Sequence, residues 1–307
     1  MKNYLTLLAS VVIMATTMVS CEKTEVEQES PSDAKESKKA PENVVTACPN
    51  VYALVLSGSS SSPVPGGFTS NIFKVDLCAA PTGYTFVSQI KVGGIPVTSV
   101  TGLCDRAGVP NFAWAVTGIN SNFPGKLLNV QISTGNASVV ATTTTPLQDI
   151  ENFGTTGLFV AIKEGTSQLM KVTVPGGVCS VFAPAGPTSQ YNGLAVVGST
   201  FHAISGTTNL VCPPNYGDIF EYTTAGGPYV AKYSYKNLPV NSSWTMKELG
   251  FYFDNCCGKR WTVGSSMGII SHNPNVAPCV LPNPTFLLNT STTGQNYWYI
   301  YDFMSKL

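Results

Sequence analysis

The feature of this sequence that most constrains its fold is a repeated pair of short β-strand patterns. In one half of the unit an apolar segment turns at glycine or polar residues and returns as a second apolar segment, as in 192–204. The other half has a polar residue inside an apolar strand pattern, then a turn at glycine and then a second apolar segment, as in 219–233. Alternation with a period of two around Gly-bearing turns is typical of β-hairpins. We therefore expect each complete unit to form four antiparallel strands.

The unit recurs about every 40–55 residues, which is the period of propeller blades. One four-stranded sheet cannot bury both of its faces, whereas sheets stacked in a ring bury them against one another. We therefore predict an all-β chain that forms a β-propeller of about five four-stranded blades. Six blades or a β-sandwich remain alternatives. The hairpin segments on which this rests are 72–90, 100–116, 127–140, 150–162, 169–182, 192–204, 219–233 and 249–263.

The two ends of the repeat region predict how such a ring would close. The strand pattern at 51–56 has no inner strand before it, and the aromatic pattern at 297–303 is one strand more than its unit needs. We expect the last strand to complete the first blade and so join the ends of the chain. Closing a ring in this way also protects the edges of the sheets.

The Gly-Leu pairs of the first half-units, such as Gly102-Leu103, and the Ile-Phe-x-Val pattern at 72–75 resemble the blades of secreted β-propellers with degenerate repeats. The resemblance covers roughly residues 50–303. The Trp-Asp dipeptides of WD-repeat propellers and a clear kelch di-glycine pattern are absent. The resemblance implies that the first strand of each unit lines the axis of the ring.

The N-terminus has the pattern of an export signal. Lys2 precedes the apolar run at 5–15, and Met18, Val19, Ser20 and Cys21 follow. A basic start, an apolar core and small residues before a cleavage site describe a secretory signal, and the run is shorter than the roughly 20 residues of a membrane span. The ending at Cys21 resembles the lipobox of bacterial lipoproteins. The resemblance implies that residues 1–21 are a lipoprotein signal peptide, that Cys21 is lipidated and that the lipid anchors the chain to a membrane; the alternative is an ordinary cleaved signal.

Residues 22–47 are polar, acidic and free of aromatic side chains, and we interpret them as a disordered tether. Their first acids resemble the acidic stretch that directs some Gram-negative lipoproteins to the outer face of the cell; the alternative is that they only solvate the tether. We therefore expect an exported chain anchored in the cell envelope, at the outer membrane and exposed on the surface. Residues 48–307 would form the propeller-like domain. The acids concerned are Glu22, Glu25, Glu27 and Glu29.

The charge of the chain argues against some classes of partner. Lys and Arg number 17, Asp and Glu also number 17, and charged residues make up 11% of the sequence, against about a quarter in ordinary domains. Nucleic-acid binding needs a basic surface, which this balance does not favour, so we expect no nucleic-acid partner.

The cysteine content agrees with export. Without Cys21 an even number remains, which in an exported chain suggests a disulfide framework whose pairing the sequence leaves open. The adjacent cysteines at 256–257 are expected to bridge to different partners, with a strained vicinal disulfide as the alternative. The disulfide candidates are Cys48, Cys78, Cys104, Cys179, Cys212, Cys256, Cys257 and Cys279.

Acidic residues at predicted turns are the candidates for a central site. In a propeller the loops at one end converge on the axis, so acids from separate blades could meet there and hold Ca²⁺ through several oxygen ligands. The alternative is that each acid caps its own turn. We expect no other cofactor. The candidate acids of the central funnel are Asp105, Asp149, Glu151 and Asp254.

Aromatic residues of the C-terminal third suggest ligand contacts, because Trp and Tyr provide large amphipathic faces for sugars or proteins. The alternative is that they pack inside the sheets. Catalytic motifs such as HExxH or a P-loop are absent, and His202 lies in an apolar strand pattern where we expect a structural role. The candidate contact residues are Tyr216, Trp244, Trp261 and Trp298.

These observations favour a lipid-anchored binding or scaffold protein of the cell envelope that recognises a glycan or a protein through the loops of the ring. They lean against an enzyme. The main alternative is an extracellular hydrolase or lyase that acts on saccharides or lactones in the central funnel, and a purely structural module of the envelope is a further one. Propeller folds host all of these roles, so the fold does not decide among them.

Overall fold

The chain divides into two compact units, Met1–Thr46 and Ala47–Leu307. The computed structural model describes parts of the second unit only, and the expected signal peptide, Cys21 and the tether lie outside the described residues. Within the part described, no helix has the length and hydropathy that crossing a membrane requires. The described residues are 50–58, 69–77, 83–153, 156–205, 218–234, 250–254, 260–265, 268–272, 286–287 and 296–306.

These residues form five β-sheets, and four of the sheets have four strands. The first sheet has the order β22-β1-β2-β3, with strands β22 (Asn296–Lys306), β1 (Asn50–Gly58), β2 (Thr69–Asp76) and β3 (Gly83–Gln89). The second has the order β5-β4-β9-β8-β7-β6, with strands β5 (Ile95–Pro96), β4 (Lys91–Val92), β9 (Asn136–Thr142), β8 (Lys126–Gln131), β7 (Phe112–Thr117) and β6 (Val100–Asp105).

The other three sheets each follow the order of the chain. The third contains β10 (Leu147–Asn152), β11 (Phe159–Lys163), β12 (Leu169–Val172) and β13 (Cys179–Ala183). The fourth contains β14 (Gly193–Val197), β15 (Thr200–Ile204), β16 (Asp218–Thr223) and β17 (Ala231–Ser234). The fifth contains β18 (Gly250–Asp254), β19 (Arg260–Ser265), β20 (Gly268–His272) and β21 (Phe286–Leu287).

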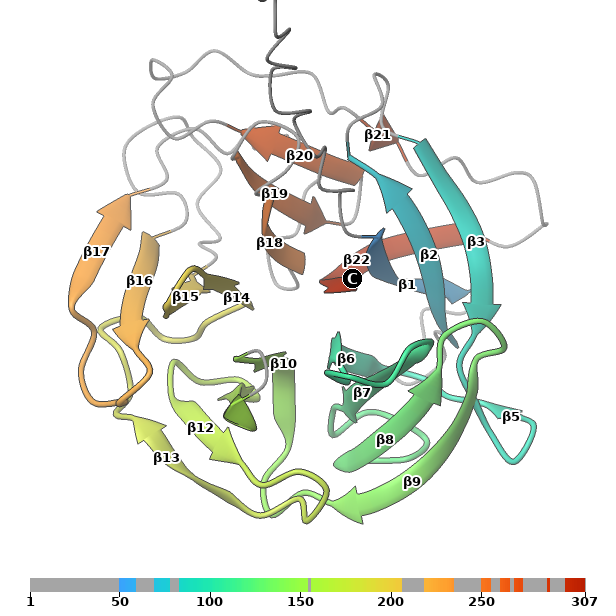
Figure 1. The fold of residues 1–307 in the computed structure, drawn as a ribbon, viewed down its shortest axis with the longest axis horizontal. Helices are drawn as coiled ribbons and strands as arrows, with labels where there is room; N and C mark the ends of the chain where they lie inside the picture. Colours follow the sequence, from blue (N-terminus) through green and yellow to red (C-terminus); the bar gives the residue numbers. More distant parts are fainter. Residues whose placement is uncertain are drawn as a thin grey trace, which may run out of the picture. The chain divides into compact units, whose positions relative to one another are not determined.

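The sheets stand side by side in a propeller-like ring (Figure 1). One strand of each sheet faces the centre, and these inner strands are β22, β6, β10, β14 and β18. Each inner strand contacts the next one around the ring, and β18 contacts β22. The all-β prediction and the ring arrangement are therefore confirmed, and the alternative of a β-sandwich is wrong.

The prediction of four strands in every sheet is wrong for the second sheet, which has six. The extra strands β4 and β5 form a short antiparallel hairpin, and β4 pairs in parallel with β9 at Lys91↔Asn136 and Val92↔Ala137. The chain thus adds two short strands to the outer edge of the second sheet on its way from β3 to β6. A ladder of two residues is too short to leave a period in the sequence.

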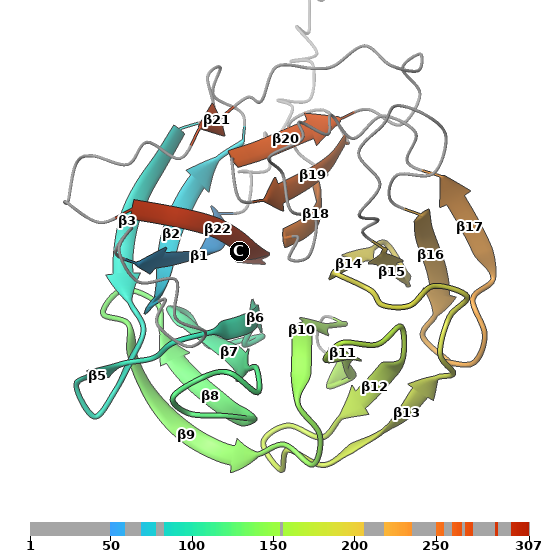
Figure 2. The same ribbon diagram turned by 180° about the vertical axis from the view of Figure 1, so that it is seen from behind.

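The final strand closes the ring, as the sequence predicts. Strand β22 pairs antiparallel with β1 over its whole length, with Val51 opposite Ser305 and Leu56 opposite Tyr299. In both views β22 lies between β1 and the centre of the ring (Figures 1 and 2). The first sheet therefore combines strands from the two ends of the folded unit.

Apolar clusters fill the spaces between neighbouring sheets. One contains Leu54 and Ile72 of the first sheet together with Leu103 and Leu128 of the second, all fully buried. Comparable clusters join the second sheet to the third and the third to the fourth. Burial of β-branched, aliphatic and aromatic side chains on both faces explains why no single sheet of this ring would be stable alone.

Replacing Phe303 by Ala should strongly destabilise the ring of sheets. The reason is that the phenyl group of Phe303, on β22, is fully buried and packs against Ala53 and Phe73. We expect the free energy of unfolding to fall by about 3–5 kcal/mol, measured by denaturant titration. Val181→Ala is the control, since Val181 is 60% exposed and its loss should cost less than about 0.5 kcal/mol. Equal effects of the two variants would contradict closure through β22.

Candidate functional site at the centre of the ring

Three inner strands bring acidic side chains together at the centre of the ring. Asp302 lies on β22, Asp105 at the end of β6, and Asp149 and Glu151 on β10. We call these four residues the axial acid cluster. Asp149 and Asp302 are 0% exposed, whereas Asp105 and Glu151 are partly exposed. The cluster contains three of the four acids that the sequence suggests for a central funnel.

A bulge in β10 presents Asp149 to the neighbouring sheet. The pairing with β11 passes from Gln148 to Ile150, so Asp149 has no partner in the ladder, and its φ is +58°. Aspartate tolerates this left-handed conformation better than most residues. Its side chain reaches the fourth sheet, where Oδ2 accepts a hydrogen bond of 2.5 Å from the backbone N–H of Leu194.

Asp302 makes the same kind of bond from the first sheet to the second. Its Oδ2 accepts a hydrogen bond of 2.5 Å from the backbone N–H of Leu103, and its Oδ1 accepts one of 2.7 Å from the N–H of Phe303. A register shift in the pairing of β22 with β1 leaves its neighbour Tyr301 without a ladder partner. Each buried aspartate therefore holds the inner strand of the following sheet.

A glycine in β6 makes room for the close approach of β10. Leu103 and Leu194, whose N–H groups are bound by the aspartates, each follow a glycine, Gly102 and Gly193. A Cβ added at Gly102 would lie 2.6 Å from the Cα of Asp149, closer than real Cβ atoms approach other atoms. The Gly102-Leu103 pair thus marks a place where two successive inner strands, β6 and β10, meet.

Burial dominates the ionisation of the cluster, because a carboxylate removed from water loses its hydration. Burial raises the pKa of Asp149 to about 7, and the hydrogen bond from Leu194 offsets part of that rise. The pKa of Asp302 is raised well above its usual range by burial and then by the charges of Asp149 and Glu151. Burial and the charge of Asp149 likewise raise the pKa of Glu151.

One oxygen of the cluster lacks a partner. Asp149 Oδ1 is buried and receives no hydrogen bond, and Asn152 Oδ1, at the end of the same strand, is in the same position. Among the residues that the structure describes, no three His, Cys, Asp or Glu side chains are arranged to hold a metal ion. The cluster is therefore a set of interacting carboxyl groups rather than a formed coordination sphere.

The side chains of the remaining candidate residues lie outside the described parts. Asp254, Trp261 and Trp298 lie on strands β18, β19 and β22, but their side chains are not among those described. Tyr216 and Trp244 fall outside the described residues. Sequence reasoning missed Asp302, because it considered residues 297–303 for strand pairing and for aromatic contacts through Trp298, and not for central acids. A signal was present, since Asp302 is the one acid in that aromatic segment.

The expectation that every cysteine of the domain joins a disulfide is wrong for the two that can be located. Cys104 and Cys179 are both free thiols. Cys104 is fully buried in the apolar cluster between the second and third sheets, and Cys179 packs at the margin of that cluster. Burial and the nearby acids raise the pKa of the Cys104 thiol. The other candidates lie outside the described residues: Cys48, Cys78, Cys212, Cys256, Cys257 and Cys279.

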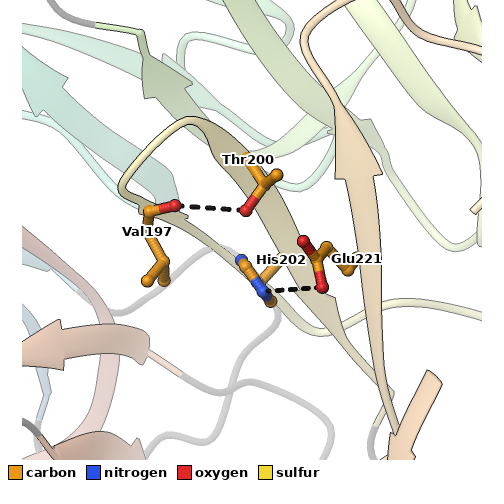
Figure 3. A network of polar contacts seen from close by, with 4 residues as sticks. All are labelled: Val197, Thr200, His202 and Glu221. Carbon is orange, nitrogen blue, oxygen red and sulfur yellow. Dashed lines mark hydrogen bonds and ion pairs between the residues drawn. The ribbon is translucent and has the colours of Figure 1, made fainter. Parts of the chain in front are cut away.

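His202 occupies a structural position in the fourth sheet, in agreement with the expectation from sequence (Figure 3). It lies opposite Glu221 in the pairing of β15 with β16, and its Nε2 is 3.8 Å from Glu221 Oε2. Burial lowers the pKa of His202, and the charge of Glu221 partly opposes this shift. Nearby, the hydroxyl of Thr200 donates to the carbonyl of Val197 at 3.1 Å and supports the turn between β14 and β15.

Comparisons with known proteins show likeness at the level of solved structures. No family model and no curated protein matches the chain. It is similar to a chain in a crystal structure of a nidogen/laminin complex, with 8% identity, a TM-score of 0.45 and coverage of 84% of this chain and 98% of that one.

Two further structures are similar over smaller shares of their length. A structural genomics protein from Bacteroides thetaiotaomicron VPI-5482 has 14% identity, a TM-score of 0.42 and coverage of 70% of this chain and 53% of its own. Kuenenia stuttgartiensis hydrazine synthase has 12% identity, a TM-score of 0.41 and coverage of 73% and 58%. The chain thus spans little more than half of either protein.

Replacing Gly102 by Ala should disturb the contact between β6 and β10, because the added methyl group would meet backbone atoms of Asp149. We expect a loss of about 1–3 kcal/mol in the free energy of unfolding, measured by denaturant titration. Gly176→Ala is the control, since its Cβ would find its nearest neighbour at 3.5 Å. A Gly102→Ala variant as stable as this control would show that the inner strands do not pack as described.

Proposed function

We propose that this chain is an exported, lipid-anchored binding or scaffold protein of the cell envelope. In this proposal the ring presents its loops and rim to a glycan or protein partner, while Cys21 carries the lipid that holds the chain at the outer membrane, with the ring exposed on the surface. The tether of residues 22–47 gives the ring reach from the membrane. The even charge balance favours contacts through apolar and hydrogen-bonding groups over electrostatic attraction.

The observation that carries the binding role is the burial of the two central aspartates. Asp149 and Asp302 are fully buried, and each accepts a backbone N–H of the following sheet. A carboxylate that acts on a substrate must reach the substrate, and these two are occupied with holding inner strands together. The central acids therefore favour a structural centre, which leaves recognition to the periphery.

The rim of the ring offers surface of a suitable kind. Large apolar side chains are exposed on successive outer strands: Phe86 is 48% exposed on β3, Val139 42% on β9 and Val181 60% on β13. Exposed apolar side chains on neighbouring elements are a common property of contact surfaces. They support a partner that is bound through shape and apolar contact.

We further propose that the five sheets are five blades of one closed propeller, in which β4 and β5 are an addition to the second blade. The support is the continuous series of contacts between inner strands, from β22 through β6, β10 and β14 to β18 and back to β22. A closed ring holds its loops in fixed positions, which suits a recognition surface.

An enzyme that acts on saccharides or lactones is a second candidate, and Glu151 is the observation that favours it. This residue is partly exposed at the centre of the ring, and burial together with Asp149 raises its pKa. A carboxyl group with a raised pKa can serve as a general acid near neutral pH. Asp105 is a partly exposed acid of the same cluster and would be its companion.

Binding without turnover is the expected outcome for the detergent-solubilised full chain. We expect it to be retained on particular glycans of an array, or to cross-link to a particular envelope protein in intact cells, and the ligand to be recovered with unchanged mass. Turnover of a bound saccharide or lactone that is lost in Glu151→Gln and kept in Glu164→Gln would contradict the binding proposal and support the enzyme.

Replacing Cys21 by Ser should release the chain from the membrane. We expect metabolic labelling with an alkyne fatty acid to mark the natural chain and to be lost in the variant, because lipidation requires the thiol of Cys21. Cys179→Ser is the control, since Cys179 lies within the folded domain and should leave labelling unchanged. Labelling that persists in Cys21→Ser would contradict the anchor.

A further inference from the structure

Asp149 and Asp302 meet at the centre of the ring although they belong to the third and first sheets. Both approach the same peptide of the second sheet: Asp302 Oδ2 binds the N–H of Leu103, and the backbone of Asp149 packs on Gly102. The two carboxyl groups also act on each other, because the charge of Asp149 raises the pKa of Asp302. Two carboxyl groups, both 0% exposed, thus lie side by side.

Among the described side chains, no positively charged group acts on this pair. The groups that act on it electrostatically or respond to it are Glu151 on β10 and Cys104 on β6, and Asp105 on β6 acts in turn on both of these. Strand β14 carries no titratable side chain, and β18 carries Tyr252 and Asp254, whose side chains are not among those described. The nearest cationic residue in sequence, Arg106, lies over the ring of Trp114 at 4.9 Å and donates to Asn129.

Ionisation of both of two neighbouring buried carboxyl groups is strongly disfavoured at neutral pH when no described side chain supplies a counter-charge. Three of their four oxygens accept backbone N–H groups, from Leu194, Leu103 and Phe303. The fourth, Asp149 Oδ1, is buried and has no partner. It is therefore the oxygen that remains available to carry a proton.

We propose that Asp149 and Asp302 share one proton, which bridges β10 to the closing strand β22 across Gly102. The proton comes from solvent and lies in a hydrogen bond between Asp149 Oδ1 and the carboxyl group of Asp302. The bridged pair carries a single negative charge. Since β22 is the strand that closes the ring, this bond adds a pH-sensitive link to the closure.

A proton fits this site better than a metal ion. Ca²⁺ takes about 6–8 oxygen ligands, whereas only one oxygen of this pair lacks a hydrogen bond. No three metal-ligating side chains among the described residues are arranged around an ion. A bound cation is therefore an outcome that the experiment must be able to detect.

The direction of the pH effect follows from the state of Asp149 in the fold. Burial raises its pKa from 3.8 to about 7, so the folded chain holds a proton that the unfolded chain has lost. The stability contributed by this proton is complete below pH 3.8 and is lost as the pH rises through about 7. The lowered pKa of His202 acts in the opposite direction, with stability lost as the pH falls below 6.5.

The variant Asp149→Asn tests the bridge, because an amide mimics the protonated acid. Asparagine accepts the Leu194 N–H, donates to Asp302 and tolerates the positive φ. The unfolding constant of the natural chain, divided by that of Asp149→Asn, should rise by up to about tenfold per pH unit between pH 5 and 7 and then level off. Because both proteins keep His202, its contribution cancels in this ratio.

Asp105→Asn is the matched control, since it removes a nearby charge that lies outside the pair. Its unfolding constant should keep the pH dependence of the natural chain. Hydrogen exchange in peptides of residues 296–306, corrected for intrinsic rates, should accelerate above pH 7 in the natural chain and not in Asp149→Asn. Equal pH dependence in the natural chain and Asp149→Asn would overturn the proposal.

An infrared measurement keeps the proposal testable if Asp149→Asn fails to fold. The natural full chain at pH 6 should show the carbonyl stretch of a buried protonated carboxyl group, and its absence at pH 6 would overturn the shared proton. If Ca²⁺ raises the unfolding midpoint of the natural chain at pH 8 but not that of Asp302→Asn, the pair binds a cation, and the shared-proton proposal is overturned.

Discussion

The pairing of the last strand with the first is the interaction on which the rest of this ring depends. Strand β22 supplies the inner edge of the sheet that β1 begins, and it also contacts β6 and β18 on either side. Where the structure describes side chains, neighbouring sheets bury each other's apolar faces, so a gap at this point would expose the faces of two sheets at once. Apolar burial therefore becomes complete only when the two ends of the folded unit have met.

Hydrogen bonds between inner strands fix how the neighbouring sheets are aligned, which apolar packing alone does not do. Asp302 links the first sheet to the second, the hydroxyl of Thr101 donates to Leu147 O between the second and third, and Asp149 links the third to the fourth. A buried polar group is costly unless it is hydrogen-bonded, so such groups favour one register between neighbouring sheets. At the centre of the ring, hydrogen bonds thus join the inner strands of the first four sheets, and apolar clusters pack between the sheets.

The contrast between Asp149 and Glu151 explains why the same cluster can be interpreted in two ways. The two residues lie on one strand, two positions apart, yet one is sealed and the other partly exposed. The sealed aspartate and Asp302 act within the protein, whereas the glutamate retains contact with solvent. Their mutual repulsion couples the ionisation of the exposed acid to that of the buried pair.

Much of the architecture was open to prediction, because hairpin periods and glycine-bearing turns are local signals. They located the strands of the third and fourth sheets, and counting strands at the two ends predicted the clasp between β1 and β22. The extra strands β4 and β5 were missed, since their ladders hold two residue pairs each. The sequence also suggested Asp105, Asp149 and Glu151 as central acids but not Asp302, whose meaning depends on a partner 199 residues away, at Leu103.

Local pattern alone thus decided the strand content, the length of the repeat and the need for a ring, since alternation and turn chemistry act over a few residues. Which acids are sealed, which cysteines are free and which glycines touch a neighbouring backbone were decided only by the packed sheets. Those properties arise where residues that are far apart in the chain are buried together. Burial there removes hydration, shifts the ionisation of acids and thiols, and limits the space for side chains.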